Sequence, residues 1–339
     1  MQILPRQQRT PEIYGEYWFN SDPLALSAFR GYPILIHFWD FTSLGSVHAL
    51  PYIHEWHKRY GAEGLVVIGV HTPAFPFGKD PIAVRKAINK LGIKYPVVSD
   101  NERMIWGAFG NRVLPTQCLI DRNGYITVVH EGEGPFQDFE HSIQSLLAES
   151  GYRSDFPIVM ESIREIDKPG AICYKATPEL FGGYQRGIIG NVEGYVPEST
   201  SHFSDPGYYV DGRIYLGGDW LVTRDYLRLN ESDGKEGLLT IPYHAKEVNV
   251  VVSPEGEKKF QVFVRQDGKF ISKDEKGEDI LIDSEGKSYI LVTQARLYNI
   301  VNNREFGEHR LTLSSRSNGF AFYSAAFVSS LIGGVISYN

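Results

Sequence analysis

Hydrophobic positions in the first half of the chain follow two kinds of spacing. Short, largely apolar runs at Ile34–Phe38 and Leu65–Val70 are typical of central strands that are buried on both faces of a sheet. Apolar residues from Val47 to Tyr60 recur at helical spacing, and Phe136–Ala148 predicts a closing helix. Strands that alternate with helices predict a mixed sheet covered on both faces.

Local signals add detail to this picture. Asp80 and Pro81 predict the start of a helix that runs through Leu91, because Asp is a good N-cap and Pro suits the first turn. The Asn123–Gly124 pair predicts a tight hairpin turn that leads into Tyr125–His130. The first half of the chain therefore reads as one α/β domain.

The pattern changes after about Gly151. Short apolar runs are then broken by Gly, Asp and Asn, with turn pairs such as Asp267–Gly268 between them. The runs are Val248–Val252, Phe260–Arg265, Ile280–Ile282, Tyr289–Thr293 and His309–Leu313. This spacing predicts an all-β sandwich or jelly roll. We expect an α/β domain over 1–150, a linker over 151–169 and a β-sandwich over 170–339.

Composition narrows the classes of function. The 339 residues carry a formal net charge of −7 with a pI near 5.8, which argues against a nucleic-acid partner because that requires clustered basic residues. The two cysteines, Cys118 and Cys173, are no disulfide framework, and we interpret both as inert. His54 and His57 stand one helical turn apart without a metal-binding motif, so we expect neither metal nor cofactor.

The two ends of the chain bear on its relation to membranes. Charged residues are spread through the first 30 positions, so no signal peptide is visible and the chain as written reads as cytoplasmic. The uncharged stretch Phe320–Asn339 is long enough to cross a bilayer. Serines and glycines dilute it, and Phe320–Tyr323 matches a terminal strand, so we expect no membrane span.

The segment from Trp39 to Tyr52 holds the most informative motif. A buried strand ends in aromatic residues, and a turn of sequence Ser43-Leu44-Gly45-Ser46 leads into a helix. Thiol–disulfide enzymes built in this way carry a Cys-x-x-Cys pair there, and the helix N-terminus stabilises the first thiolate. Serine stands at both positions here. The resemblance to these enzymes implies that Ser43 and Ser46 stand at the catalytic positions of the missing redox cysteines.

Further blocks of sequence follow this turn. They are 55–60, 69–75, 79–81, 91–97, 108–112, 115–116, 119–124 and 130–134. In this order they resemble the soluble domain of DipZ-type thiol–disulfide interchange proteins, in the TlpA/redoxin branch of the thioredoxin superfamily. The resemblance covers about residues 33–134 and implies an α/β thioredoxin-like fold. Leu114 departs from it, because the family usually has an aromatic residue before the proline.

The second half carries a resemblance of its own. Thr177–Tyr184, Gly218–Trp220 and Arg296–Val301 are similar to the C-terminal domain of DipZ-type proteins. That domain resembles a carbohydrate-binding module, which implies a jelly-roll β-sandwich and suggests carbohydrate as a partner. Proteins of this family are often extracytoplasmic, which leaves the compartment open.

The resemblance also implies where a partner would bind. The proline facing the active-site turn is cis in this fold, so Pro115 is expected to be cis and to leave the preceding backbone free for an extended peptide. The alternative is that Pro115 only shapes its loop. Trp39 and Phe41 would either form an apolar rim around the turn or cap the core. Leu114 lies at that rim.

The two serines leave several functions open. In one interpretation the chain lost its cysteines naturally, and in the other it is an oxidoreductase in which they were replaced by Ser43 and Ser46. Other departures from the family pattern, such as Gly45 and His48, favour natural loss. A hydrolytic Ser43 lacks the Gly-x-Ser-x-Gly elbow, and the simplest role of Ser43 is to cap the helix, worth ~1 kcal/mol. We predict a non-catalytic peptide- or protein-binding module. The alternatives are a mutated thiol–disulfide oxidoreductase and a protein that binds carbohydrate through its C-terminal domain.

Overall fold

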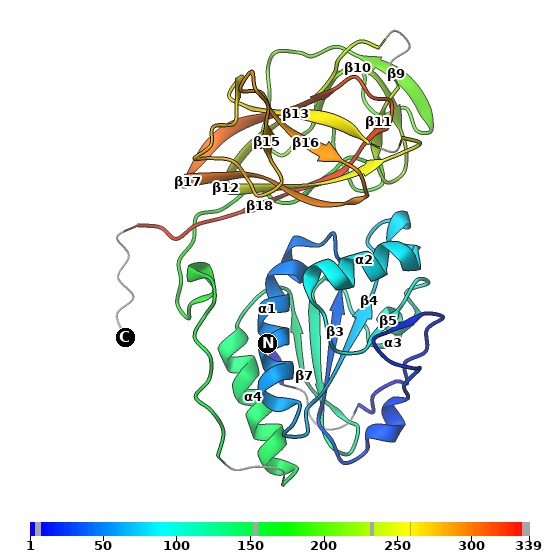
Figure 1. Ribbon diagram of the computed structural model, residues 1–339, viewed down its shortest axis with the longest axis vertical. Coiled ribbons are helices and arrows are strands. Elements are labelled where there is room, and N and C mark those ends of the chain that lie inside the picture. The colour runs from blue at the N-terminus through cyan, green and yellow to red at the C-terminus, as the bar shows by residue number, and fades with distance from the viewer. Residues whose placement is uncertain (4–7, 152–154, 231–233, 258, 334–339) are drawn as a thin grey trace. The chain divides into compact units, whose positions relative to one another are not determined.

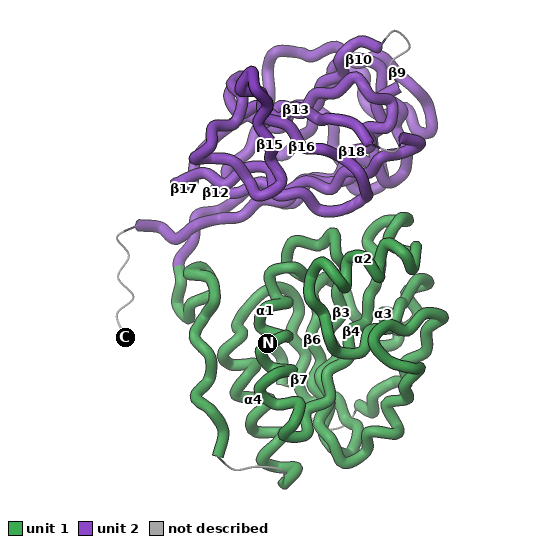
Figure 2. The backbone as a smooth tube through the Cα atoms, viewed as in Figure 1, with its two compact units in different colours: residues 1–171 green, residues 172–339 purple. Residues whose placement is uncertain are grey.

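The chain folds into two compact units. A computed structural model describes residues 1–3, 8–151, 155–230, 234–257 and 259–333. Unit 1 comprises residues 1–171 and unit 2 residues 172–339, shown in two colours in Figure 2. The segment 151–169, which we expected to be a linker, therefore belongs to unit 1. Within these described ranges, no helix is long and apolar enough to cross a membrane.

Unit 1 is built on a mixed sheet with the strand order β1-β7-β6-β3-β4-β5-β2. The strands are β1 (Gln2–Ile3), β2 (Trp18–Phe19), β3 (Ile34–Trp39), β4 (Val66–His71), β5 (Val97–Ser99), β6 (Thr116–Ile120) and β7 (Ile126–Glu131). β3, β4 and β5 are parallel, whereas β6 pairs antiparallel with both β3 and β7. Every residue of β3 is buried, as expected of a central strand covered on both faces. The thioredoxin-like fold is confirmed.

Helices cover both faces of this sheet. They are α1 (Leu44–Tyr60), α2 (Pro81–Leu91), α3 (Met104–Ala108) and α4 (Phe136–Glu149). α1 and α4 lie side by side on one face (Figure 1), where Trp56 stacks on Phe139 with ring centroids 5.2 Å apart. Such a pair contributes about 0.5–1.5 kcal/mol beyond its area burial. The predicted start of α2 is confirmed, because the Asp80 carboxylate accepts a hydrogen bond from the Ile82 N–H.

One row of polar side chains crosses the core beneath α1 and α4. His37 on β3 is opposite Gln117 on β6, and Gln117 is opposite His130 on β7. All three side chains are buried, and among the described residues none of their nitrogen or oxygen atoms has a hydrogen-bond partner. Burial lowers the pKa of His37 to about 3 and that of His130 to about 4, so both imidazoles are neutral at physiological pH.

Unit 2 consists of strands around one hydrophobic core. They are β8 (Leu180–Phe181), β9 (Ser199–Phe203), β10 (Tyr215–Val222), β11 (Leu227–Leu229), β12 (Gly237–Pro254), β13 (Phe260–Gln266), β14 (Lys269–Phe270), β15 (Leu281–Ile282), β16 (Ser288–Val292), β17 (Arg296–Ser315) and β18 (Phe320–Val328). β12 pairs with both β17 and β18. The all-β fold and the terminal strand are confirmed, while 334–339 lie outside the described residues.

Candidate functional site

The turn between β3 and α1 forms the helix start that the sequence predicts. Ser43 is the N-cap of α1, and its hydroxyl accepts a hydrogen bond from the Ser46 N–H at 3.3 Å. Ser43 is half-buried. Ser46 is fully buried, and its hydroxyl accepts from the Asp40 N–H at 3.3 Å. The first serine is thus partly exposed at the helix N-terminus, and the second is buried.

The loop that precedes β6 meets this turn. The Leu114–Pro115 peptide bond is cis, as predicted. A Cβ atom placed on Gly45 would lie 3.1 Å from Pro115 Cδ, so the turn and the loop are in close contact. Pro115 is buried and Leu114 is half-buried. In the described part of the chain, the backbone N–H and C=O of Leu114 have no hydrogen-bond partner.

Trp39 and Phe41 do not belong to an accessible rim. Their exposed fractions are 0% and 6%, so they offer almost no surface to a partner. Both rings pack on His71 of β4: Phe41 stacks at a centroid distance of 5.4 Å, and Trp39 meets it edge-on at 5.1 Å. Of the two roles expected from the sequence, a rim around the turn or a cap on the core, Trp39 and Phe41 therefore have the second.

A buried acid–base pair lies directly behind the turn. Asp40 and His71 are both fully buried, with Asp40 Oδ2 3.3 Å from His71 Nε2. Asp40 also accepts hydrogen bonds from the Thr42 N–H at 2.6 Å and the Ala74 N–H at 3.2 Å. Burial raises the pKa of Asp40, but His71 and Thr42 outweigh it and leave that pKa below its ordinary value. The pair fixes the turn from inside rather than offering a reactive group to solvent.

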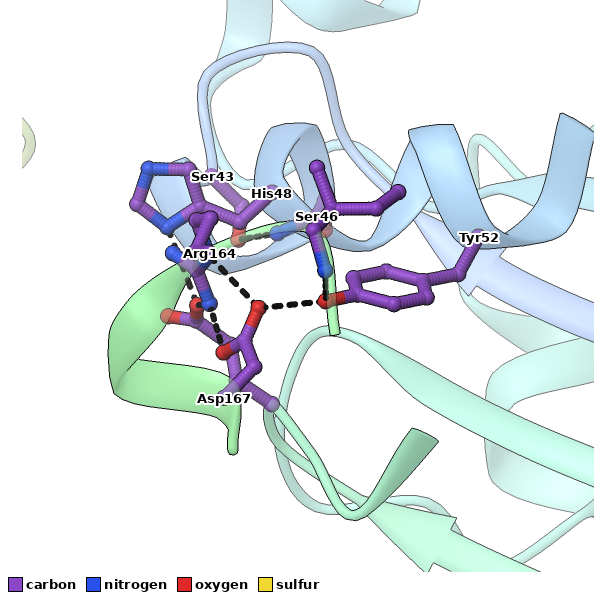
Figure 3. Close-up of polar contacts among 8 residues, drawn as sticks. Ser43, Ser46, His48, Tyr52, Arg164 and Asp167 are labelled. Carbon is purple, nitrogen blue, oxygen red and sulfur yellow. Dashed lines mark hydrogen bonds and ion pairs between the residues drawn. The ribbon is translucent and has the colours of Figure 1, made fainter. Parts of the chain in front are cut away.

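A chain of polar contacts lies beside the first turns of α1 (Figure 3). His48 Nδ1 is 2.9 Å from Glu133 Oε2, and Arg164 donates to the same oxygen. Arg164 also donates to both oxygens of Asp167, which accepts a hydrogen bond from the Tyr52 hydroxyl at 2.8 Å. Burial raises the pKa of Glu133, but His48 and Arg164 outweigh it and lower it to about 2. The Glu133 carboxylate is therefore ionised at neutral pH.

The remaining candidate groups are two cysteines and two histidines. Cys118 is buried in β6, and burial raises the pKa of its thiol to about 12; Cys173 lies in unit 2, and both thiols are free. His54 and His57 pack against Tyr95, with ring centroids 6.0 and 5.8 Å away. Across the described residues, no group of three or more His, Cys, Asp or Glu side chains is arranged to hold a metal ion.

Comparisons with known proteins show which families the two parts of the chain resemble. Residues 20–143 match the family model described as Redoxin, and residues 177–327 match the one described as Thioredoxin like C-terminal domain. The chain is 31% identical to Protein DipZ of Mycobacterium bovis over 242 residues, which cover 70% of this chain and 34% of DipZ. The chain is a homologue of the DipZ/TlpA-type thiol–disulfide oxidoreductases. It spans about a third of the length of DipZ.

Two shorter proteins are each similar to less than half of this chain. The thiol–disulfide oxidoreductase YkuV of Bacillus subtilis is 26% identical over 145 residues, which cover 42% of this chain and 97% of YkuV. A solved structure of a thioredoxin-like superfamily protein, SPOA0173, is 25% identical with a TM-score of 0.40, covering 44% of this chain and 99% of that one. The family resemblance drawn from the sequence is confirmed.

Proposed function

We propose that the chain is a non-catalytic member of the DipZ/TlpA family that binds an extended peptide or protein segment beside its turn. The observation that carries the proposal is the backbone of Leu114, which is half-buried and lacks intramolecular hydrogen-bond partners among the described residues. An extended peptide can add to such a backbone by strand pairing, with affinity supplied by main-chain hydrogen bonds.

The chemistry of the turn supports binding without disulfide exchange. Ser43 and Ser46 hold oxygen at the positions where exchange needs sulfur, and a hydroxyl without an adjacent base is a weak nucleophile. His48, the imidazole nearest in sequence to the turn, has its Nδ1 engaged with Glu133. The same geometry supports an alternative, in which Ser43 and Ser46 replace the cysteines of an active oxidoreductase, because one position is accessible and the other is buried behind it.

Isothermal titration with an S-carboxymethylated insulin B chain tests the binding proposal, since that peptide is extended and carries no reactive thiol. We expect saturable binding to the full chain. Leu114→Asp places a charge beside the pairing backbone and should weaken binding at least about fivefold, or ~1 kcal/mol. Ile82→Asp on α2, where Ile82 is 63% exposed, is the matched control and should bind like the parent. Absence of binding, or equal binding by both variants, would refute the proposal.

A second candidate function, carbohydrate binding by unit 2, is favoured by a groove on that unit. The groove has a volume of about 690 Å³. It is lined by aromatic, charged, amide and hydroxyl side chains, namely Phe260, Phe263, Phe270, Arg265, Lys287, Arg316, Glu236, Glu257, Gln261, Ser315 and Ser317. Phenyl rings suit the C–H faces of a sugar ring, and mixed charged and hydroxyl groups suit its many donors and acceptors.

A glycan array followed by titration of the best glycan tests this second candidate. Phe263 is half-buried on the outward-facing side of β13, so Phe263→Ala should abolish glycan binding and leave the fold intact. Tyr208→Ala, which removes a ring that is 73% exposed outside the groove, should leave binding unchanged. An array without a hit, or a hit insensitive to Phe263→Ala, would remove carbohydrate from consideration.

A further inference from the structure

The segment 155–168, which we call the strap, is bound to the outside of α1 and α4 along its first half. The buried Glu140 carboxylate of α4 accepts from the Met160 N–H at 3.0 Å, and Arg59 of α1 donates to both Glu140 and the Ile158 carbonyl at 3.0 Å. Phe156 and Met160 pack against the core of unit 1. The strap is therefore an integral part of this unit and not a free connection.

The second half of the strap carries a charged side chain toward the turn. The Tyr52 hydroxyl of α1 accepts from the Ile163 N–H at 2.8 Å and donates to Asp167 at 2.8 Å. Asp167 in turn holds the guanidinium of Arg164 through two hydrogen bonds. Only 5% of the Asp167 side chain and 22% of the Arg164 side chain are exposed, so Arg164 is fixed in one orientation.

That orientation brings Arg164 onto Glu133 at the edge of the proposed peptide site. A Cβ atom placed on Gly45 would lie 3.2 Å from Glu133 Oε1 and 3.1 Å from Pro115 Cδ. The Glu133 side chain thus covers the middle of the turn at the point where the turn meets the Pro115 loop. An extended segment that paired with Leu114 and continued past Pro115 would meet the Glu133–Arg164 pair.

We propose that the strap is an intramolecular clamp on this site, and that the Arg164–Glu133 contact is its latch. With the latch closed, the side chains of Glu133 and Arg164 restrict access to the turn from the side of Gly45. With the latch broken, the second half of the strap is held by fewer contacts and access to the turn increases. The role of the clamp in controlling access of a peptide rests on the proposed peptide-binding function. The clamp itself is testable without a peptide.

The clamp is tested with a thiol reporter at the turn. In a Ser43→Cys background, the rate of alkylation by iodoacetamide is measured across pH. The plateau rate at high pH is compared between variants, because it reports access to the thiolate rather than the pKa of the thiol. Arg164→Ala should raise the plateau rate at least fivefold and speed hydrogen exchange of residues 163–168. Lys168→Ala is the matched control, since it removes an exposed strap cation whose ion pair is with Glu165, and it should change neither quantity.

The outcomes separate the clamp from the peptide-binding proposal. If Arg164→Ala releases the strap by hydrogen exchange but leaves the alkylation plateau unchanged, the strap is only structural and the clamp is refuted. If Arg164→Ala fails to release residues 163–168, the double variant Tyr52→Phe with Asp167→Asn weakens the other contacts of this second half of the strap, and the same comparison applies. Faster alkylation in a protein that binds no carboxymethylated peptide would support the clamp and refute the peptide-binding function. Faster alkylation with at least fivefold tighter peptide binding supports both.

Discussion

Replacing His37 by leucine should make unit 1 more stable at neutral pH and less sensitive to acid. His37 is fully buried in β3, and within the described residues neither of its ring nitrogens has a hydrogen-bond partner. An unpaired buried polar group costs about 1–3 kcal/mol, which an apolar side chain of similar volume avoids. The variant should therefore raise the free energy of unfolding at pH 7 by that amount.

The acid dependence of this effect follows from the two pKa values of the imidazole. Burial holds the pKa of His37 at about 3 in the folded chain, against 6.5 as the ordinary value. The pKa of His37 is lower in the folded chain than in the unfolded chain, so acid protonates the unfolded state first. The part of the free energy of unfolding that depends on neutral His37 is therefore fully present above pH 6.5 and is lost as the pH falls toward 3. At about pH 4.5, two pH units into this window, the unfolded state gains about 2.7 kcal/mol through its protonated His37. His37→Leu removes this loss.

Hydrogen exchange of the β3 and β6 amides, measured at pH 7 and at about pH 4.5, reports the opening of unit 1 separately from unit 2. The exposed residue His141 on α4 provides the control, because His141→Leu removes an imidazole that water already solvates. The control should lose as much stability in acid as the parent. A His37→Leu variant that is less stable than the parent at pH 7, or that loses just as much stability in acid, would falsify this reasoning and show that His37 is well solvated or well bonded.

Three further predictions concern the turn and its support. The chain as it stands should reduce insulin with dithiothreitol no faster than background, because Ser43 and Ser46 hold no sulfur. Activity above background would mean that Cys118, despite a pKa of about 12, or Cys173 reacts. In the double variant Ser43→Cys with Ser46→Cys, ultraviolet absorbance should show a first thiol with a pKa clearly below ~8.5, because the helix N-terminus favours the thiolate. The two cysteines should also form a disulfide reversibly in glutathione buffers. A first thiol that titrates like free cysteine argues against an intact turn. Glu140→Ala should lower the free energy of unfolding, measured by urea titration, by about 3–5 kcal/mol, because Arg59 loses its buried partner. A loss below ~1 kcal/mol would contradict the anchoring role of Glu140.

Features that depend only on neighbouring residues can be predicted from the amino-acid sequence. The N-caps at Ser43 and Asp80 are local hydrogen bonds between a side chain and the next helical turn, so residue type and spacing were enough to predict them. The Asp267–Gly268 turn is local as well, with φ angles of 52° and 78° that the pair tolerates. The burial of β3 followed from an uninterrupted apolar run, and the cis bond at Pro115 followed from the family resemblance.

Contacts between groups that are far apart in the sequence depend on the packing of the whole unit. Arg164 and Glu133 are 31 positions apart and Tyr52 and Asp167 are 115 apart, so no local spacing announces either contact. The sequence predicts a linker over 151–169, whereas two of its apolar residues, Phe156 and Met160, pack against the core of unit 1.

The burial of side chains near the turn also depends on residues that are distant in the sequence. Trp39 and Phe41 are aromatic residues at the end of a strand, and the sequence allows them either to face solvent or to pack inward. The position of His71 on the neighbouring strand β4 settles the choice, because both rings pack on it and are shielded from water. Residue type and periodicity describe a short stretch of chain, whereas exposure and ionic contacts depend on the other segments that cover it.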